Sequence, residues 1–255
     1  MPRRWIVIFC LGIVALLASA CSGTNPTTTA RANSPSESHV YVALGEDGSG
    51  GFTYRGDLRS MWAQIFYRSA LGTSGTFYDY SMPNETAADA LQHVLPGALK
   101  LHPDLVTIWL GTADIVAGIS PSVYSQELER LVRGFRRGGA VVLLANVAPR
   151  QLDPALDTCL AQAAACGRPG VAPPALLPSS SLIADGSAYD GVIDSVAQRT
   201  GAHVVNLGAV LTPAINKVGL SNLLTSNDMS LSQRGADLVA RAFESQLPQR
   251  FEKQH

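Results

Sequence analysis

The sequence predicts an α/β protein with three layers, in which helices cover both faces of a doubly wound parallel sheet of about five strands. Short apolar runs recur along the chain, as expected for strands that are buried on both faces. These runs are His39–Leu44, Phe77–Tyr80, Leu105–Leu110, Ala140–Val147 and Ala202–Leu207. Stretches with apolar residues at helical spacing alternate with them, at Leu58–Leu71, Ala87–Leu101, Ser122–Arg137, Ile183–Thr200 and Ser232–Leu247. Strand-helix alternation of this kind implies parallel strands.

The composition is that of a folded protein. Hydrophobic residues make up 46% of the 255 residues and charged residues 15%, with a formal net charge of −1. These values exclude a disordered chain and a collagen-like repeat. Because the Lys and Arg residues are scattered and balanced by Asp and Glu, we expect no nucleic-acid partner.

Residues 1–21 resemble a bacterial lipoprotein signal peptide with its lipobox. Arg3 and Arg4 precede an apolar stretch, Trp5–Leu17, that is shorter than the ~20 residues a membrane-spanning helix needs. Small residues then lead to Cys21, the residue that would be lipidated after cleavage. We therefore predict an exported, extracytoplasmic protein that lipidated Cys21 anchors to a bacterial cell membrane. An ordinary signal peptide cut nearby, or an uncleaved anchor, is the alternative.

Residues 22–37 have the composition of a disordered tether. They include no large apolar side chain and are rich in Ser, Thr, Pro and Asn, so they cannot bury enough surface to fold. Residues 38–255 remain for a single domain with a substantial core, which we expect to be a monomer.

The cysteines agree with export. Because Cys10 lies in the signal segment and Cys21 would carry the lipid, we expect Cys159 and Cys166 to pair in a disulfide that closes a short loop. A metal site is the weaker alternative, since no second cysteine or histidine cluster lies nearby. Both residues fall within residues 148–181, a proline-rich stretch that we predict to be a long irregular insertion.

Two helix boundaries carry a chemical signal. Ser120 before Pro121 is typical of a helix N-cap followed by the first turn. Gly138–Gly139 follow Arg136–Arg137, which is typical of a helix C-terminus, where cations complement the dipole and glycine accepts a left-handed backbone. These signals predict that one helix starts at about residue 121 and ends at about residue 137.

Any chemistry should lie at one edge of the predicted sheet. In doubly wound sheets, ligands bind outside the carboxyl ends of the strands. The loops that follow Leu44, Tyr80, Leu110 and Val147, together with the loop around Ser226, should therefore converge.

Four sequence blocks stand in these loops. They read YVALGEDGSGG after the first strand, DYSMPNETAADAL after the second, VTIWLGTADI after the third, and SNDMSLSQRGADLVARAF near the C-terminus. In pattern and order they resemble the blocks of the SGNH (GDSL-type) hydrolase superfamily, over about residues 39–247. The resemblance implies a flavodoxin-like sheet and acyl transfer by a Ser-His-Asp arrangement with an oxyanion hole. Such chemistry needs an activated hydroxyl, a base within hydrogen-bond reach and donors aimed at the developing oxyanion.

Carried across residue by residue, the resemblance places other residues at the catalytic positions. Asp47 stands where the family has its nucleophilic serine, and Ser230 stands at the histidine. Asn227 takes the place of the triad aspartate. The oxyanion-hole glycine falls on Asn84 and the oxyanion-hole asparagine on Ala113. Because loss of the nucleophile or the base removes several orders of magnitude of rate, this alignment predicts a pseudo-hydrolase.

Ser49 is an alternative nucleophile, since a two-residue insertion would bring it to the nucleophile position in a G-S-G turn. The base would still be missing, because the histidines lie near predicted strand starts, on a helix or in the C-terminal tail. They are His39, His93, His102, His203 and His255. An active esterase or acyl hydrolase of lipid or carbohydrate esters, acting through Ser49, is therefore the alternative function.

We predict that the altered site is a ligand cleft. The chain would act as a binding or scaffold module at the cell envelope, with a carbohydrate or an acyl ester as ligand and without a cofactor. The residues expected to line the cleft are Glu46, Asp47, Ser49, Asn84, Thr112, Asp114 and Ser230.

Other interpretations of these loops are weaker. Divalent cations prefer oxygen ligands, which Glu46, Asp47, Asp114 and Asp228 would supply. We expect Asp114 and Asp228 to bind backbone N–H groups instead, and predict no metal site. A glycosidase needs two carboxylates at a defined separation, which no spacing here indicates. Trp109 would either stack on a ligand or, as we favour, belong to the core.

Overall fold

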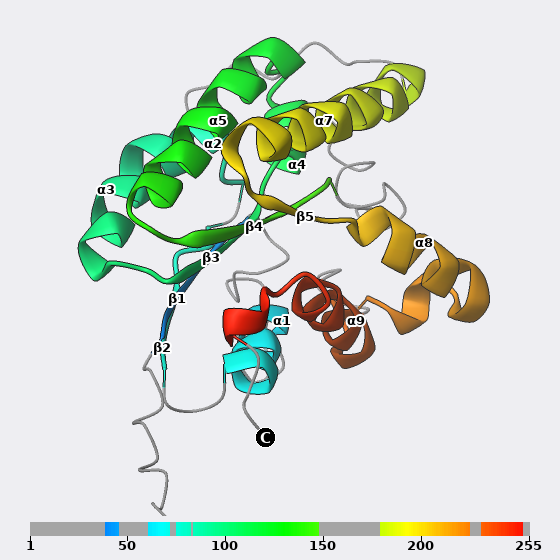
Figure 1. Ribbon diagram of the computed structural model, residues 1–255. Helices are drawn as coiled ribbons and strands as arrows, with labels where there is room; N and C mark the ends of the chain where they lie inside the picture. The colour runs from blue at the N-terminus through cyan, green and yellow to red at the C-terminus, as the bar shows by residue number, and fades with distance from the viewer. Residues whose placement is uncertain are drawn as a thin grey trace, which may run out of the picture. The chain divides into compact units, whose positions relative to one another are not determined.

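The computed structural model describes residues 39–45, 61–71, 75–82, 84–147, 179–224 and 231–251. In this part of the chain, parallel strands form one five-stranded sheet with the order β2-β1-β3-β4-β5 (Figure 1). The strands are β1 (Val40–Gly45), β2 (Thr76–Asp79), β3 (Leu105–Trp109), β4 (Val141–Ala145) and β5 (His203–Val205). Each overlaps one of the predicted runs. The order is that of a flavodoxin-like sheet, so the predicted fold class is confirmed.

Alternate residues of the central strands point to opposite faces of the sheet. In β1, Tyr41 and Ala43 belong to one core, whereas Val42 and Leu44 belong to the other, and all four are fully buried. The parallel register places Tyr41 beside Leu105 of β3. Burial on both faces explains why the strands have continuous apolar sequences.

One face of the sheet is covered by α1 (Trp62–Phe66), α8 (Leu207–Val218) and α9 (Gln233–Glu244) (Figure 1). Aromatic side chains join these helices: the rings of Trp62 and Phe243 stack with their centroids 4.4 Å apart. Short turns belong to the same part of the protein, namely η2 (Tyr67–Leu71), η6 (Leu220–Asn222) and η7 (Gln249–Phe251).

The other face is covered by a second set of helices, of which α5 and α7 are the longest (Figure 1). The set comprises α2 (Ala87–Asp89), η3 (Ala90–Val94), α3 (Leu95–Ala98), η4 (Leu99–Leu101), α4 (Thr112–Val116), α5 (Pro121–Arg137) and α7 (Ser179–Thr200). The buried side chains of α5 recur at helical spacing and include Tyr124, Leu128, Leu131 and Phe135.

The helix boundaries of α5 agree with the chemical signals in the sequence. Ser120 is the N-cap, and its hydroxyl accepts a hydrogen bond from the Val123 N–H at 3.4 Å. Gly139 has the expected left-handed backbone, with φ +92°. Gly138 differs from the expectation, since its φ of −73° is right-handed. The left-handed residue that ends the helix is therefore the second glycine of the pair.

Three helical details depart from the predictions. The stretch Ala87–Leu101 changes from α-helical to π-helical turns and ends in a 3-10 turn. Pro96 lies within it, has no N–H to donate, and disfavours an α-helical residue before it. The pattern of the sequence does not predict α8, because Pro213 lies inside that helix. Finally, α7 begins at Ser179, so the last residues of the predicted irregular insertion are helical.

Some predictions fall on residues outside the described part of the chain. These include the signal segment and tether, residues 1–37, and residues 148–178 with both Cys159 and Cys166. The disulfide and the lipidation of Cys21 therefore stay predictions. Among the helices that are described, none combines the length and the apolarity needed to cross a bilayer.

Gly235 allows α9 to lie close to the chain that precedes it, and this contact yields a stability prediction. A Cβ at this position would lie 2.4 Å from the Leu223 carbonyl oxygen, which is too close for any side chain. We expect Gly235→Ala to lower the free energy of unfolding by about 1–3 kcal/mol, measured by urea denaturation. Gly191→Ala is the matched control, because an added Cβ in α7 meets nothing within 4 Å and should stabilise by about 0.5–1 kcal/mol. Equal effects of the two changes would contradict the prediction.

Candidate functional site

Within the described residues, the loops after β2 and β3 approach one another at one edge of the sheet, as predicted. The loop after β2 crosses the end of β1: the Tyr80 N–H donates to the Ala43 carbonyl at 2.9 Å, and the Met82 N–H donates to the Gly45 carbonyl at 3.0 Å. This brings the second sequence block next to the last residue before the first block's acidic loop. The carboxyl ends of β1 and β2 thus form a common surface.

Asn84 has a left-handed backbone, with φ +55°. Glycine adopts this region most readily, and asparagine is one of the few other residues that do. The position aligned with the oxyanion-hole glycine therefore keeps a conformation that favours glycine. Thr86 then caps α2, since its hydroxyl accepts the Asp89 N–H at 3.2 Å while the Asp89 carboxylate accepts the Thr86 N–H at 3.1 Å.

Asp114 joins the loop after β3 to the loop after β2. Its side chain is fully buried, and its two carboxylate oxygens accept the Ala87 N–H at 3.2 and 3.1 Å. Burial raises the pKa of the Asp114 carboxyl from 3.8 to about 7; the Ala87 N–H opposes this shift, and the nearby Glu127 carboxylate adds to it. The prediction that Asp114 binds a backbone N–H is confirmed. Its role is to hold two loops together.

The turn between β3 and α4 holds the next predicted positions. Gly111 has φ +133°, and a Cβ there would lie 3.0 Å from Val147 and 3.2 Å from the Tyr124 hydroxyl, so only glycine fits. Thr112 is half-buried, whereas Ala113 is buried. The Ala113 methyl group offers no hydrogen-bond donor, at the position where the family's oxyanion-hole asparagine would stand.

Two tyrosines that the sequence analysis did not single out support this turn. The Tyr124 hydroxyl donates to the Leu110 carbonyl at 3.0 Å, and its ring stacks on that of Tyr189 with centroids 4.4 Å apart. The Tyr189 hydroxyl donates to the Ile119 carbonyl. Helical spacing predicts that these side chains are buried, but only the packing of α5 on α7 shows that they reach the loop.

Asn146 and Asn206 form a second pair that the sequence analysis missed. The Asn146 amide donates to the Asn206 Oδ1 at 3.1 Å, and its own Oδ1 accepts the Leu207 N–H at 2.7 Å. Both residues directly follow a strand, β4 and β5 respectively, and that shared position was the available signal. Together they cap the start of α8 at the ends of β4 and β5.

The described histidines lie away from these loops, as predicted. His39 precedes β1 and His203 is the first residue of β5, so both stand at the opposite edge of the sheet. His102 precedes β3 and has a left-handed backbone with φ +48°, while His93 is exposed in η3. Within the described residues, no imidazole stands at the carboxyl ends of the strands.

Several predicted cleft residues are not among the described residues. The structure brings Asn84, Thr112 and Asp114 to the same edge of the sheet. Glu46, Asp47, Ser49 and Ser230 lie outside its described part, so their placement in the cleft stays a prediction. Asn227, Asp228 and His255 also lie outside the described residues.

One of the alternative interpretations, that of Trp109, can be tested on the described residues. Trp109 is only 5% exposed and packs edge-on against Trp62, with ring centroids 6.0 Å apart, so its core role is confirmed. In the ranges that the structure covers, no group of three or more His, Cys, Asp or Glu side chains is arranged to hold a metal ion.

Comparison with known proteins agrees with this geometry. The sequence model of the GDSL-like lipase/acylhydrolase family matches residues 38–238. No curated protein sequence is significantly similar to the chain.

Solved structures with the same fold include three hydrolases. The psychrotrophic esterase EstA from a Pseudoalteromonas species is 15% identical, with a TM-score of 0.58 over 82% of this chain and 96% of that one. The lipase/acylhydrolase from Enterococcus faecalis is 17% identical, with a TM-score of 0.58 over 85% and 100% of the two chains. The acetyl xylan esterase AlAXEase is 13% identical, with a TM-score of 0.59 over 82% and 100%. At these identities the similarity shows the fold alone.

The buried Asp114 carboxyl predicts that stability depends on pH. Its folded-state pKa of about 7 exceeds the ordinary 3.8, so the folded protein holds this proton more tightly than the unfolded chain does. The resulting stabilisation is fully present below about pH 4 and is lost as the pH rises through about 7. In Asp114→Asn the amide oxygen still accepts the Ala87 N–H, but no charge is buried. We expect the variant to be more stable than wild type at about pH 8, by on the order of 2–4 kcal/mol.

The measurement is urea unfolding of both proteins at several pH values. At about pH 4 the two should differ little, because the wild-type carboxyl is then protonated. A variant that is less stable than wild type at about pH 8 would show that the charged carboxylate is favourable in the fold.

Proposed function

The chain belongs to the GDSL-like lipase/acylhydrolase family, and from that premise we propose that it is a catalytically inactive member, which binds a ligand at the cell envelope instead of hydrolysing it. Its site would be the edge of the sheet where Asn84, Ala113 and Asp114 meet. The proposal is supported by a framework that keeps its geometry where the reactive groups have changed.

The observation that carries the proposal is the turn around Ala113. Gly111 and Asp114 keep their matched positions, and each makes a contact that defines the local backbone. The residue between them that would supply an oxyanion-hole donor has only a methyl group. Removal of one such donor lowers kcat by about 10²–10³. The framework is therefore retained without a group that acyl transfer depends on.

The nucleophile and base positions support the same conclusion. The alignment gives Asp47 at the nucleophile and Ser230 at the base, and neither can perform the usual role. A carboxylate cannot act through the serine mechanism, and a hydroxyl cannot take up the proton that an imidazole would. The described histidines, at the far edge of the sheet or on η3, offer no replacement.

The ligand that we propose is a carbohydrate or an acyl ester. One solved relative in fold is an acetyl xylan esterase, and another is an esterase described as inhibited by monoethylphosphonate. A cleft that has lost its reactive groups but not its shape would still bind molecules of this class. No cofactor is required for such binding.

The cellular place that we propose is the outer side of a bacterial membrane. It is supported by the sequence of the first 21 residues, by the polar tether of residues 22–37, and by Cys21 at the lipidation position. A disulfide between Cys159 and Cys166 would be stable in that compartment.

An active esterase is the second candidate, because the family to which the chain belongs is one of acylhydrolases. It requires Ser49 as nucleophile and a base from outside the described residues. The same assay decides between the two candidates.

We expect the purified protein to hydrolyse a short-chain p-nitrophenyl ester no faster than its Ser49→Ala variant. Ser122→Ala is the control, since Ser122 is exposed at the start of α5 and does not belong to the predicted cleft residues. The measurement is the release of p-nitrophenol against a buffer blank. Rapid turnover that Ser49→Ala abolishes and Ser122→Ala preserves would establish the active esterase.

We also expect Cys21→Ser to move the protein from the membrane fraction to the soluble fraction of the cells that produce it. In this proposal the lipid is what holds the protein firmly to the membrane once the signal segment has been removed. Cys159→Ser is the control and should leave the distribution unchanged. A Cys21→Ser protein that stays in the membrane fraction would favour the uncleaved anchor.

A further inference from the structure

The helices that return the chain to the starts of the strands end in cations. Lys100 is in the last turn of η4, before β3, and Arg199 is in the last turn of α7, before β5. Arg136 and Arg137 end α5, before β4. In a parallel sheet these helix ends lie at the edge where the strands begin (Figure 1). We call these four residues the basic edge.

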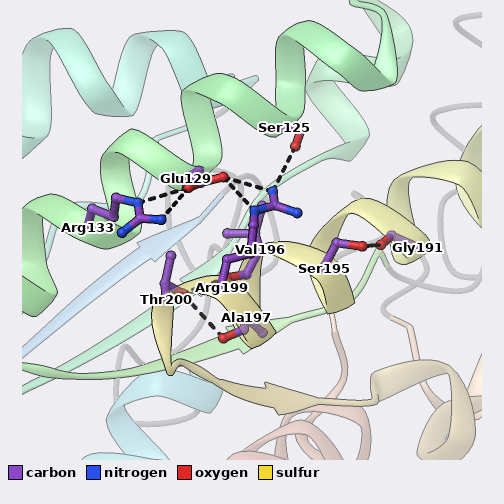
Figure 2. Close-up of polar contacts among 9 residues, drawn as sticks. All are labelled: Ser125, Glu129, Arg133, Gly191, Ser195, Val196, Ala197, Arg199 and Thr200. Atoms are coloured by element: carbon purple, nitrogen blue, oxygen red, sulfur yellow. Dashed lines mark hydrogen bonds and ion pairs between the residues drawn. The ribbon is translucent and has the colours of Figure 1, made fainter.

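Carboxylates neutralise the basic edge only in part. Glu129 accepts hydrogen bonds from Arg133, at 2.8 and 2.6 Å, and from Arg199, at 2.8 Å, so one carboxylate serves two guanidinium groups (Figure 2). Arg199 also donates to the Ser125 hydroxyl at 3.3 Å. Asp104, before β3, is a second carboxylate at this edge of the sheet. The four cations of the basic edge outnumber these two carboxylates.

The remaining members of the basic edge are held differently. Arg136 donates to the Thr200 carbonyl at 3.3 Å and to the Ala140 carbonyl at 3.2 Å, so it bonds to neutral groups and keeps its net charge. Lys100 and Arg137 are exposed. Leu99 and Gly138 lie close together, since a Cβ on Gly138 would be 3.4 Å from the Leu99 side chain. Lys100 and Arg137, which are the neighbours of Leu99 and Gly138 in the sequence, therefore lie on the same part of the surface and add to one positively charged surface.

Acidic residues lie near the opposite edge of the sheet. The described ones are Asp79, Glu85, Asp89, Asp114 and Asp190. Because Glu85 and Asp114 are buried, Asp79, Asp89 and Asp190 present the negative charge at this acidic edge. The cations and these carboxylates thus lie at different ends of the strands.

The N-terminal segment leaves the domain at the basic edge. The described chain begins at His39, directly before β1. Two contacts hold the start of β1 in place. The Val40 N–H donates to the Asp104 carboxylate at 2.8 Å, and the His39 ring packs against Phe251 with ring centroids 4.9 Å apart. The tether of residues 22–37 is thus joined to the same edge that carries the cations.

We propose that the basic edge docks on the anionic lipid headgroups of the membrane that holds the chain, so that the candidate ligand site faces away from the bilayer. This inference rests on the lipid tether of the proposed function. A disordered chain of the length of residues 22–37 would span about 20 Å on average, which would keep the domain near the lipid surface. The few cations of the basic edge are then enough to dock the domain, since each Lys or Arg near an anionic surface strengthens binding about fivefold. The acidic edge is repelled and turns outward.

Cations at helix C-termini also complement the helix dipole, and that effect alone would explain them without a membrane. The two explanations differ in what happens at an anionic lipid surface. The experiment is amide hydrogen exchange of the full lipidated protein on vesicles of phosphatidylcholine alone and of phosphatidylcholine mixed with phosphatidylglycerol. On the anionic vesicles we expect several-fold slower exchange in residues 99–104, 136–141 and 198–203, and no change in residues 84–89.

Charge reversal tests the assignment to this edge. Lys100→Glu combined with Arg137→Glu should lower the population of the docked orientation by about tenfold or more and abolish the protection. Lys217→Glu combined with Arg234→Glu is the matched control, with the same change in charge at exposed positions of α8 and α9. Raising the salt concentration should act like the Lys100 and Arg137 double variant, because screening weakens surface attraction.

The outcomes separate this inference from the proposal on which it rests. Two outcomes would overturn the docking surface and leave the tether intact. In the first, the protein is firmly attached to the membrane but exchanges equally on both kinds of vesicle. In the second, the Lys217 and Arg234 double variant loses as much protection as the Lys100 and Arg137 double variant. Slower exchange of residues 84–89 on the anionic vesicles would show that the site edge faces the bilayer, and would overturn the proposed orientation. Recovery of the wild-type protein in the soluble fraction would overturn the tether and the docking surface together.

Discussion

A parallel sheet has to return the chain to its starting edge after every strand, and this constraint organises the rest of the protein. Each crossover places loops at one edge and helix C-termini at the other. The loops carry the altered catalytic blocks, and the helix ends carry the cations that complement their dipoles. The candidate site and the proposed membrane surface are therefore two consequences of one topology, at opposite ends of the same strands.

At the site edge, the connections between loops matter more than any reactive group. The buried Asp114 carboxylate holds the start of α2, the Tyr124 hydroxyl holds the end of β3, and Gly111 lets the turn pass between them. These groups define backbone positions and would do so whether or not acyl transfer occurs. A chain can therefore lose its nucleophile, base and oxyanion donor while its loops keep the arrangement that once served them. Retention of this framework is what a binding role requires.

The sequence predicted the strands better than the helices. Each predicted apolar run overlaps a strand, and the central strands β1, β3 and β4 are buried along almost their whole length. The helix at Leu207–Val218 was missed because Pro213 opposes it locally, while its cap at Asn206 and its packing against α9 outweigh that cost. At the site, Asn84 and Asp114 were identified from motif position. Tyr124, Tyr189 and Asn146 were not, because their partners come from distant parts of the chain.

By itself, the sequence determined the fold class, the polar composition of residues 22–37 and the identity of the residues at each family position, since these follow from local pattern and composition. Only the tertiary structure decided which of those residues share an environment. The ordinary carboxyl of Asp114 acquires a pKa of about 7 because folding removes it from water. The scattered cations become one surface because three crossovers end at the same edge. Burial and proximity depend on the whole packed chain, and no local stretch of sequence contains them.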